Sequence, residues 1–175
     1  MGCGRKPMKD YVNLDWLDYP WVDVKHDLNK IPYPFKDSQF DEIYCSQTLE
    51  HLNDTLRVLE EMWRITKKGG IIVIKVPHFS IHNALSDLSH KKVFSYESFD
   101  IFEREEDITP NFGMARFKIL EKKVNFSVTN KLRHFNFIVN FIINKVLIWK
   151  YNLYERIFCY MLPSDELIFK LIVVK

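Results

Sequence analysis

Residues 54–76 read DTLRVLEEMWRITKKGGIIVIKV, and this stretch decides the fold class. We expect a helix over about residues 54–66, because apolar residues recur there on one helical face. Gly69-Gly70 is a typical helix terminator. Ile71–Val76 is a nearly continuous apolar run, which is typical of a strand buried on both faces of a parallel sheet. A helix followed by a buried strand favours an α/β fold.

Short apolar runs extend this pattern in both directions. Before the helix, strands are expected over Tyr11–Asp15, Trp21–Asp27 and Phe40–Cys45. After it, we expect a short helical stretch near 97–103, a strand over Phe117–Val128, a helical region over about 135–161 and a strand over Leu167–Lys175. This order predicts a Rossmann-like α/β sheet that is mostly parallel and has an antiparallel C-terminal strand.

Composition limits the kind of protein. The chain has 175 residues, 47% of them apolar, which suits one domain over residues 1–175. The net charge of +2 is small and the basic residues are scattered, so no nucleic-acid partner is expected. Cys3, Cys45 and Cys159 match no metal-binding spacing, so no metal is expected. The odd number of cysteines, without a secretory signal, indicates reduced thiols and a cytoplasmic protein.

One apolar segment, Phe135–Tyr151, has some features of a membrane span. Asn136, Asn140 and Asn144 recur in it every four residues, so their amides share one helical face. The apolar stretch is also shorter than the roughly 20 residues that a span needs. We therefore expect a soluble helix and no membrane span, with an interfacial helix as the alternative.

Five motifs follow one another along the first part of the chain. They are Gly2-Cys3-Gly4; Asp15 at the end of the first expected strand; His26-Asp27-Leu28 with the Pro-containing segment and Asp37-Ser-Gln-Phe-Asp41 behind it; Ser46-Gln-Thr-Leu-Glu-His-Leu52; and Glu61-Met-Trp-Arg64 before Gly69-Gly70. Each motif is modest alone, but their joint order and spacing are specific.

In this order the motifs resemble those of the class I S-adenosylmethionine (SAM)-dependent methyltransferases, in particular the methyltransferase type 11-like domain. The resemblance covers about residues 2–102 well and the tail more loosely. It implies SAM as the cofactor, a cofactor-binding half over residues 1–77, and an acceptor-side cap with C-terminal strands over residues 78–175. Glu61 and Arg64, three residues apart on one helical face, correspond to scaffold in this family.

The resemblance also implies a cofactor site. Asp15 would accept hydrogen bonds from the ribose hydroxyls, Asp27 from the adenine amino group, and Leu28 would pack near the adenine. Glycines in the first motif let the backbone approach the ligand closely. The complete set of expected cofactor-binding residues is Gly2, Cys3, Gly4, Asp15, Trp16, Asp27, Leu28 and Ser46.

Methyl transfer requires an aligned acceptor, exclusion of water and, for an oxygen acceptor, a base. The candidate catalytic residues are His51, His78, Asp87 and His90, and a structural role for each remains open. Glu50 and His51 have a further structural alternative, in which Glu50 bonds backbone amides at a helix start. The expected acceptor is a small molecule or a glycan-type compound, beneath a roof formed by the aromatic segment Phe94–Phe102 and the helix at 135.

Members of the family carry a hydrophobic strand directly before the glycine motif, whereas here Met1 alone precedes Gly2. We therefore expect a gap in the sheet. Three explanations are open: a truncated form of a longer protein, which we favour; a strand supplied by a partner chain or a homo-oligomer; or a degenerate domain. The alternative function is accordingly a non-catalytic binding or assembly module. A Rossmann dehydrogenase is disfavoured, because Arg-Lys-Pro follows Gly4 in place of a third glycine.

Overall fold

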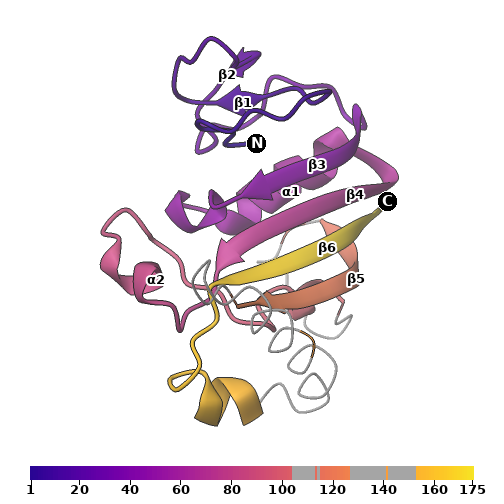
Figure 1. Cartoon of the computed structure of the whole chain (residues 1–175). Helices are drawn as coiled ribbons and strands as arrows, with labels where there is room; N and C mark the ends of the chain where they lie inside the picture. Colours follow the sequence, from indigo (N-terminus) through magenta and orange to yellow (C-terminus); the bar gives the residue numbers. More distant parts are fainter. Residues whose placement is uncertain (104–112, 114, 127–140, 142–152) are drawn as a thin grey trace.

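The computed structural model describes residues 1–103, 113, 115–126, 141 and 153–175. Two sheets form within these residues (Figure 1). The first is a parallel pair of β1 (Leu14–Asp15) and β2 (Val24–Lys25). The second has the order β3-β4-β6-β5 and consists of β3 (Phe40–Ser46), β4 (Thr66–Pro77), β6 (Glu166–Val174) and β5 (Arg116–Asn125).

The strand directions confirm the predicted fold class. β3 and β4 are parallel, and β6 runs antiparallel to both of its neighbours, β4 and β5. β6 is therefore the reversed C-terminal strand of an otherwise parallel arrangement, and it lies inside the sheet (Figure 1).

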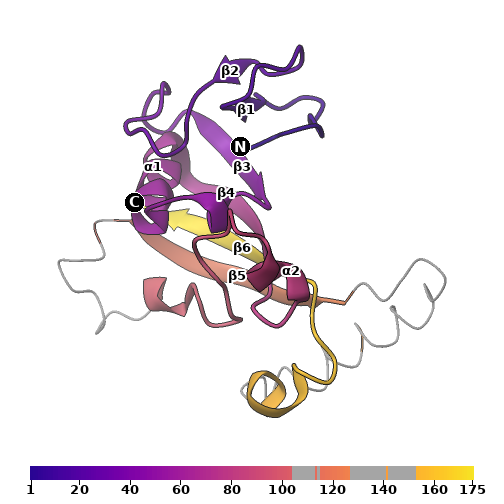
Figure 2. The ribbon, with the colours of Figure 1, turned by 90° about the vertical axis from the view of Figure 1, so that its left-hand side faces the viewer.

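The core forms where the alternating side chains of the sheet meet the apolar face of one helix. Ile72, Ile74 and Val76 of β4 are fully buried, and Leu167, Phe169 and Leu171 of β6 are equally buried. The helix α1 (Thr55–Ile65) lies against the sheet, as Figures 1 and 2 show, and buries Val58, Leu59, Met62 and Ile65. The Asp54 side chain caps this helix by accepting a hydrogen bond from the Arg57 N–H.

The helix ends within one residue of the expected position, but the role expected for Gly69-Gly70 as its terminator was wrong. α1 ends at Ile65, and Thr66 already has extended backbone angles. β4 begins at Thr66 and contains Gly69-Gly70. A Cβ on Gly70 would lie 2.6 Å from the Thr66 Cγ2 and 2.9 Å from the Asp41 carbonyl oxygen. Gly70 is therefore needed for the close approach of neighbouring backbone, and it does not terminate the helix.

The remaining elements are short. They are the 3-10 turns η1 (Leu49–His51) and η2 (Asp100–Phe102), the helix α2 (His82–Ser86) and a π-helical turn at Tyr154–Phe158. Most of the predicted helix over 135–161, including the Asn136, Asn140 and Asn144 positions, lies outside the described residues. Of the residues that are described, none belongs to a helix with the length and apolarity that a membrane crossing needs.

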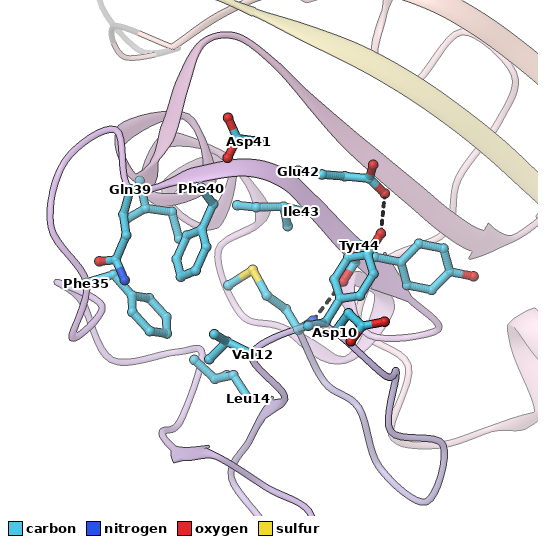
Figure 3. Close-up of a pocket in the computed structure, with 13 residues that line it drawn as sticks. Asp10, Val12, Leu14, Phe35, Gln39, Phe40, Asp41, Glu42, Ile43 and Tyr44 are labelled. Carbon is cyan, nitrogen blue, oxygen red and sulfur yellow. Dashed lines mark hydrogen bonds between the residues drawn. The ribbon is translucent and has the colours of Figure 1, made fainter.

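The expected gap in the sheet lies between β1 and β3. At the strands' carboxyl ends the first residues of the chain bridge it: the Met1 amine donates to the Tyr44 carbonyl of β3, and the N–H groups of Gly2 and Cys3 donate to the Leu14 carbonyl of β1. Beside the amino-terminal part of β3, a groove of about 390 Å³ lies between the two sheets (Figure 3). Its apolar lining includes Val12, Leu14, Phe35, Phe40, Ile43 and Ile65.

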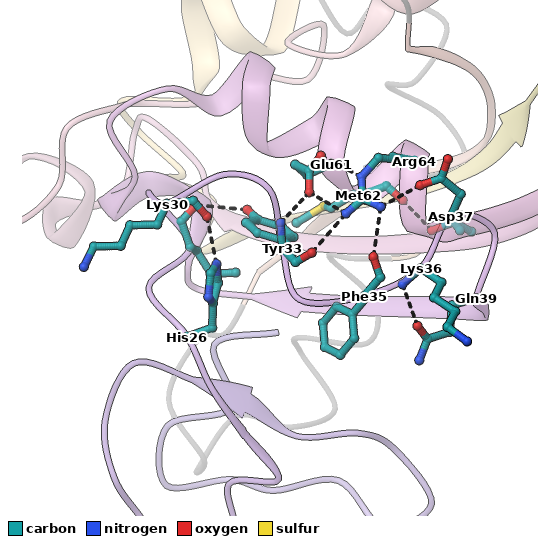
Figure 4. Close-up of polar contacts among 12 residues, drawn as sticks. His26, Lys30, Tyr33, Phe35, Lys36, Asp37, Gln39, Glu61, Met62 and Arg64 are labelled. Carbon is teal, nitrogen blue, oxygen red and sulfur yellow. Dashed lines mark hydrogen bonds and ion pairs between the residues drawn. The ribbon is translucent and has the colours of Figure 1, made fainter.

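A partly buried ion pair, between Arg64 and the buried Glu61, fixes the loop that leads from β2 to β3 (Figure 4). The Arg64 guanidinium donates two hydrogen bonds of 2.8 Å to the Glu61 carboxylate and a third, of 2.6 Å, to Asp37. It also donates to the carbonyl oxygens of Tyr33 and Phe35, while the Tyr33 N–H donates to Glu61. One helical side chain thus holds three points of the loop, which confirms the scaffold role expected for Glu61 and Arg64.

We expect Arg64→Met to lower the free energy of unfolding by about 3 kcal/mol, because it leaves the buried Glu61 carboxylate without its cation. Lys67→Met is the matched control: Lys67 pairs with Asp41 at 2.8 Å, and both side chains are largely exposed, so the loss is below about 1 kcal/mol. Urea denaturation measures both values. Equal losses would show that the Arg64 network does not anchor the loop.

The same pair predicts a pH dependence. Burial disfavours the charged form of Glu61, but the hydrogen bonds from Arg64 and the Tyr33 N–H outweigh it and hold the pKa of Glu61 below its ordinary value of 4.5. A carboxyl group with a lowered pKa stabilises the fold above its unfolded pKa and loses this contribution as the pH falls through its folded pKa. The stability advantage of the wild type over Glu61→Gln should therefore shrink below about pH 4.5. Urea titrations of both proteins between neutral and acidic pH test this, and a constant advantage would contradict it.

Candidate functional site

A cavity of about 490 Å³ lies at the carboxyl ends of β1, β2 and β3. This is the edge at which open α/β sheets bind their ligands. Its lining includes six of the eight residues predicted to hold the cofactor: Gly2, Gly4, Asp15, Trp16, Asp27 and Leu28. The other two, Cys3 and Ser46, line a neighbouring cavity of about 630 Å³, which Gly2 also lines. We call the first cavity the cofactor cavity.

Sequence reasoning missed part of this lining. The additional residues follow the ends of β1, β2 and β3 and are Leu17, His26, Asn29, Gln47, Thr48, His51 and Leu52. His51 was predicted, but as a catalytic residue. Asn29 and Gln47 directly follow the predicted residues Leu28 and Ser46, so extending each motif by one residue along the chain would have found both.

The glycine motif packs tightly against the segment that follows β3. Gly2 has φ +64°, and a Cβ there would lie 2.3 Å from the Thr48 Oγ1. The Gly4 N–H donates to Asp15 Oδ2 at 2.7 Å, and the Leu17 N–H donates to Asp15 Oδ1 at 3.0 Å. The buried Asp15 carboxylate therefore shapes the loops on both sides of it, and each oxygen keeps a second lone pair for a ligand.

The β2 side of the cavity presents a second carboxylate beside an apolar surface. Asp27 Oδ1 accepts hydrogen bonds from the backbone and side-chain amides of Asn29, and the backbone bond is the main cause that lowers the pKa of Asp27. Leu28 is buried at the cavity wall. Trp16 is 67% exposed, so its ring offers an uncovered aromatic face.

These residues fit SAM. The volume lies within the range of small-molecule sites, about 300–1,000 Å³. Two carboxylates supply acceptors for hydroxyl and amino groups, while Leu28 and the Trp16 ring supply apolar contacts for a flat heterocycle. At Gly2 the backbone approaches Thr48 too closely to leave room for a side chain.

A second cavity, of about 590 Å³, lies beside the first, because Gln47 and His51 line both. Three of the four predicted catalytic residues, His51, Asp87 and His90, line this cavity, and the remaining lining includes Glu50, Pro77, Ile81, Asn83, Ser86 and Asp165. We call it the acceptor cavity. The His51 and His90 rings are in edge contact, with centroids 4.7 Å apart.

The structure orients the histidines of this cavity through their Nδ1 atoms. His51 Nδ1 lies 3.0 Å from the Ser89 hydroxyl oxygen, and that hydroxyl donates to Asp87 Oδ1 at 2.6 Å. His90 Nδ1 lies 3.3 Å from the Ala84 carbonyl oxygen. These hydrogen bonds hold the two rings beside each other although they are 39 positions apart in the sequence.

Glu50 departs from its structural alternative. Its side chain is 1% exposed, and among the described residues neither carboxylate oxygen has a hydrogen-bond partner. Burial raises the pKa of Glu50 to about 7, although the backbone amides of Glu50 and Thr48 and the His90 ring partly oppose the rise. These amides act on the carboxylate as the structural alternative expected, but neither forms a hydrogen bond of standard geometry with it. The sequence left a structural and a catalytic role open for Glu50 and did not place it among the candidate site residues.

His78 lies outside both cavities as they are lined by the described residues. Its fully buried ring is 2.7 Å from the Ser80 hydroxyl oxygen through Nδ1 and 3.2 Å from Glu155 Oε1 through Nε2. The structure therefore does not bring His78 together with the other three catalytic candidates.

Comparison with protein families finds that residues 7–74 match the family described as methyltransferase domain. Curated relatives include the demethylmenaquinone methyltransferase of Streptomyces avermitilis, 40% identical over 58 residues, and that of Lysinibacillus sphaericus, 38% identical over 55 residues. These alignments cover 33% and 31% of this chain, and 24% and 23% of the relatives. The chain thus spans about a quarter of the length of the curated relatives it matches.

Solved structures share the fold. An S-adenosylmethionine-dependent methyltransferase from Mesorhizobium loti has a TM-score of 0.52 at 15% identity, over 91% of this chain and 78% of that chain. The [4+2]-cyclase SpnF has a TM-score of 0.51 at 19% identity, over 88% of this chain and 56% of that chain. The cyclase shows that this fold also occurs in a protein named for a reaction other than methyl transfer.

Proposed function

We propose that this chain, which carries a class I SAM-dependent methyltransferase domain, binds SAM in the cofactor cavity and methylates a small-molecule or glycan-type acceptor in the acceptor cavity. The observation that supports this proposal most is the gathering of six predicted cofactor-binding residues around one cavity at the carboxyl ends of the strands.

Several residues have the chemistry to hold SAM. Asp15 and Asp27 offer carboxylate oxygens to hydroxyl and amino groups, Leu28 and Trp16 offer apolar contact, and the glycine motif offers close backbone approach. When bound, SAM supplies a methyl group on a positively charged sulfonium, so the cofactor carries the reactivity. The protein's part is then binding, orientation and exclusion of water.

The acceptor cavity supplies the orienting groups. His51 lines both cavities, so it marks the boundary at which an acceptor would meet the cofactor. The polar side chains of His51, Asp87 and His90 would orient an acceptor's hydroxyl or amino group there, and one of these three groups would take its proton. The matches to demethylmenaquinone methyltransferases cover less than a quarter of those proteins, and we draw no acceptor from them.

The alternative, a non-catalytic binding or assembly module of the same fold, has one observation in its favour. Both oxygens of Asp15 already accept backbone hydrogen bonds, so this carboxylate has a structural role without any cofactor. A module of this kind would bind SAM weakly or not at all.

Titration calorimetry with SAM and with its demethylated product tests the proposal. We expect binding by the whole chain, and we expect Asp27→Ala to weaken it about 10- to 100-fold, because a charge-assisted hydrogen bond is worth roughly 1.5–3 kcal/mol. Asp18→Ala is the matched control: this exposed carboxylate pairs with Lys25 and does not line the cavity, so affinity stays unchanged. A folded chain that binds neither compound would overturn the proposal and favour the non-catalytic module.

A further inference from the structure

Three side chains with metal-ligating atoms meet at the floor of the acceptor cavity. Glu50, His51 and His90 each offer one such atom, and these atoms all lie within 4.8 Å of one another. The Glu50 Oε1 and the His51 Nε2 are 3.9 Å apart. The Glu50 carbonyl oxygen accepts the N–H groups of Lys91 and Lys92, which fixes the loop that carries His90 beside Glu50.

The hydrogen bonds of the two histidines engage the Nδ1 atom of each ring and not its Nε2 atom. Each Nδ1 already faces a partner, the Ser89 hydroxyl for His51 and the Ala84 carbonyl for His90. A carbonyl oxygen accepts, so the Nδ1 of His90 carries its proton and the lone pair of the neutral ring lies on Nε2, 3.7 Å from Asp87 Oδ2. Metal-ligating histidines commonly have their second nitrogen held in this way by a hydroxyl, carboxylate or carbonyl group.

The Glu50 carboxylate, which is buried without a hydrogen bond, provides an independent observation that points to a ligand. This carboxylate is 1% exposed, faces the cavity, and has no hydrogen-bond partner among the residues described. A buried carboxylate stays charged only when it is paired, hydrogen-bonded or coordinated to a metal. The imidazoles of His51 and His90 lie close to it, and neither offers it a hydrogen bond in this arrangement.

We propose that Glu50, His51 and His90 form a binding site for a first-row divalent metal ion such as Zn²⁺. Two imidazoles and one carboxylate are a set that such ions favour, whereas Mg²⁺ prefers oxygen ligands. A metal ion bound about 2.0–2.2 Å from each ligand holds the ligand atoms roughly 3–4 Å apart. Modest rotations of the three side chains from the present arrangement achieve this. The motif-based expectation of no metal considered cysteine spacings, and these ligands contain no cysteine.

The position of the site gives the metal a role. Three protein ligands leave a coordination position open toward the acceptor cavity, and His51 also lines the cofactor cavity. An acceptor hydroxyl bound at that position would be oriented and made more acidic by the cation. This role rests on the proposed methyltransferase function, whereas the metal site itself does not.

Calorimetry with Zn²⁺ alone, in a buffer without chelators, tests the site. We expect one Zn²⁺ per chain and no comparable binding of Mg²⁺. Glu50→Gln and His90→Ala should each weaken Zn²⁺ binding by at least about 100-fold, since losing even an outer hydrogen-bond partner costs about 10- to 100-fold. Ser89→Ala, which removes the hydroxyl that bonds both His51 Nδ1 and Asp87 Oδ1 but no metal ligand, should cost about tenfold.

His82→Ala is the matched control, because His82 is an exposed histidine near the same cavity that does not belong to the cluster. It should leave Zn²⁺ affinity unchanged. Circular dichroism of each variant separates loss of the site from loss of the fold. A folded wild type that binds no Zn²⁺, or binds it equally well in Glu50→Gln, would overturn the proposal.

A separate titration with SAM distinguishes this failure from failure of the proposed function. Zn²⁺ binding without SAM binding leaves the metal site standing and removes its catalytic role. SAM binding without Zn²⁺ binding leaves the proposed function standing and refutes the metal site.

Discussion

The Arg64 guanidinium is the point on which the arrangement of the cofactor cavity depends. Through its bonds to Glu61, Asp37 and two backbone carbonyls it fixes the loop between β2 and β3 on α1. That loop contains Asp27 and Leu28, so one partly buried ion pair links the position of the helix to the loop that forms the cavity wall. The C-terminal Lys175 donates to the Arg64 carbonyl as well, which links the end of β6 to the same place.

Local sequence patterns predicted most of the fold and part of the site. Buried runs such as Ile71–Val76 mark strands wherever they occur, and the Glu61–Arg64 spacing places both side chains on one helical face. Asp15 and Asp27 were predicted from the resemblance to the methyltransferase family, and they meet at one cavity because they lie at or just after the carboxyl ends of two parallel strands. The role of Gly70 was predicted wrongly, because this glycine lies in β4 and is required by its contacts with Thr66 and the Asp41 carbonyl oxygen.

Other features of the site depend on contacts between distant segments. Nothing near Glu50 in the sequence shows that its carboxylate is left without a hydrogen bond, since this follows from how residues 87–92 fold over it. His51 and His90 were predicted separately, but their edge contact depends on Ser89 and Ala84. His78 has the same residue type, yet the fold brings it to Glu155 and not to the lining of the cavity.

The place of β6 inside the sheet has a consequence for the order of folding. β5 has β6 as its neighbour in the sheet, and β4 pairs with β6 across about a hundred residues of sequence. β5 therefore cannot join the sheet before β6 has docked on β4. Such long-range pairing closes a large loop and is intrinsically slow. Until then, the edge of β4 that faces away from β3 has no neighbouring strand, and the apolar side chains of β6 are absent from the core. The docking of β6 is therefore the step that completes the core.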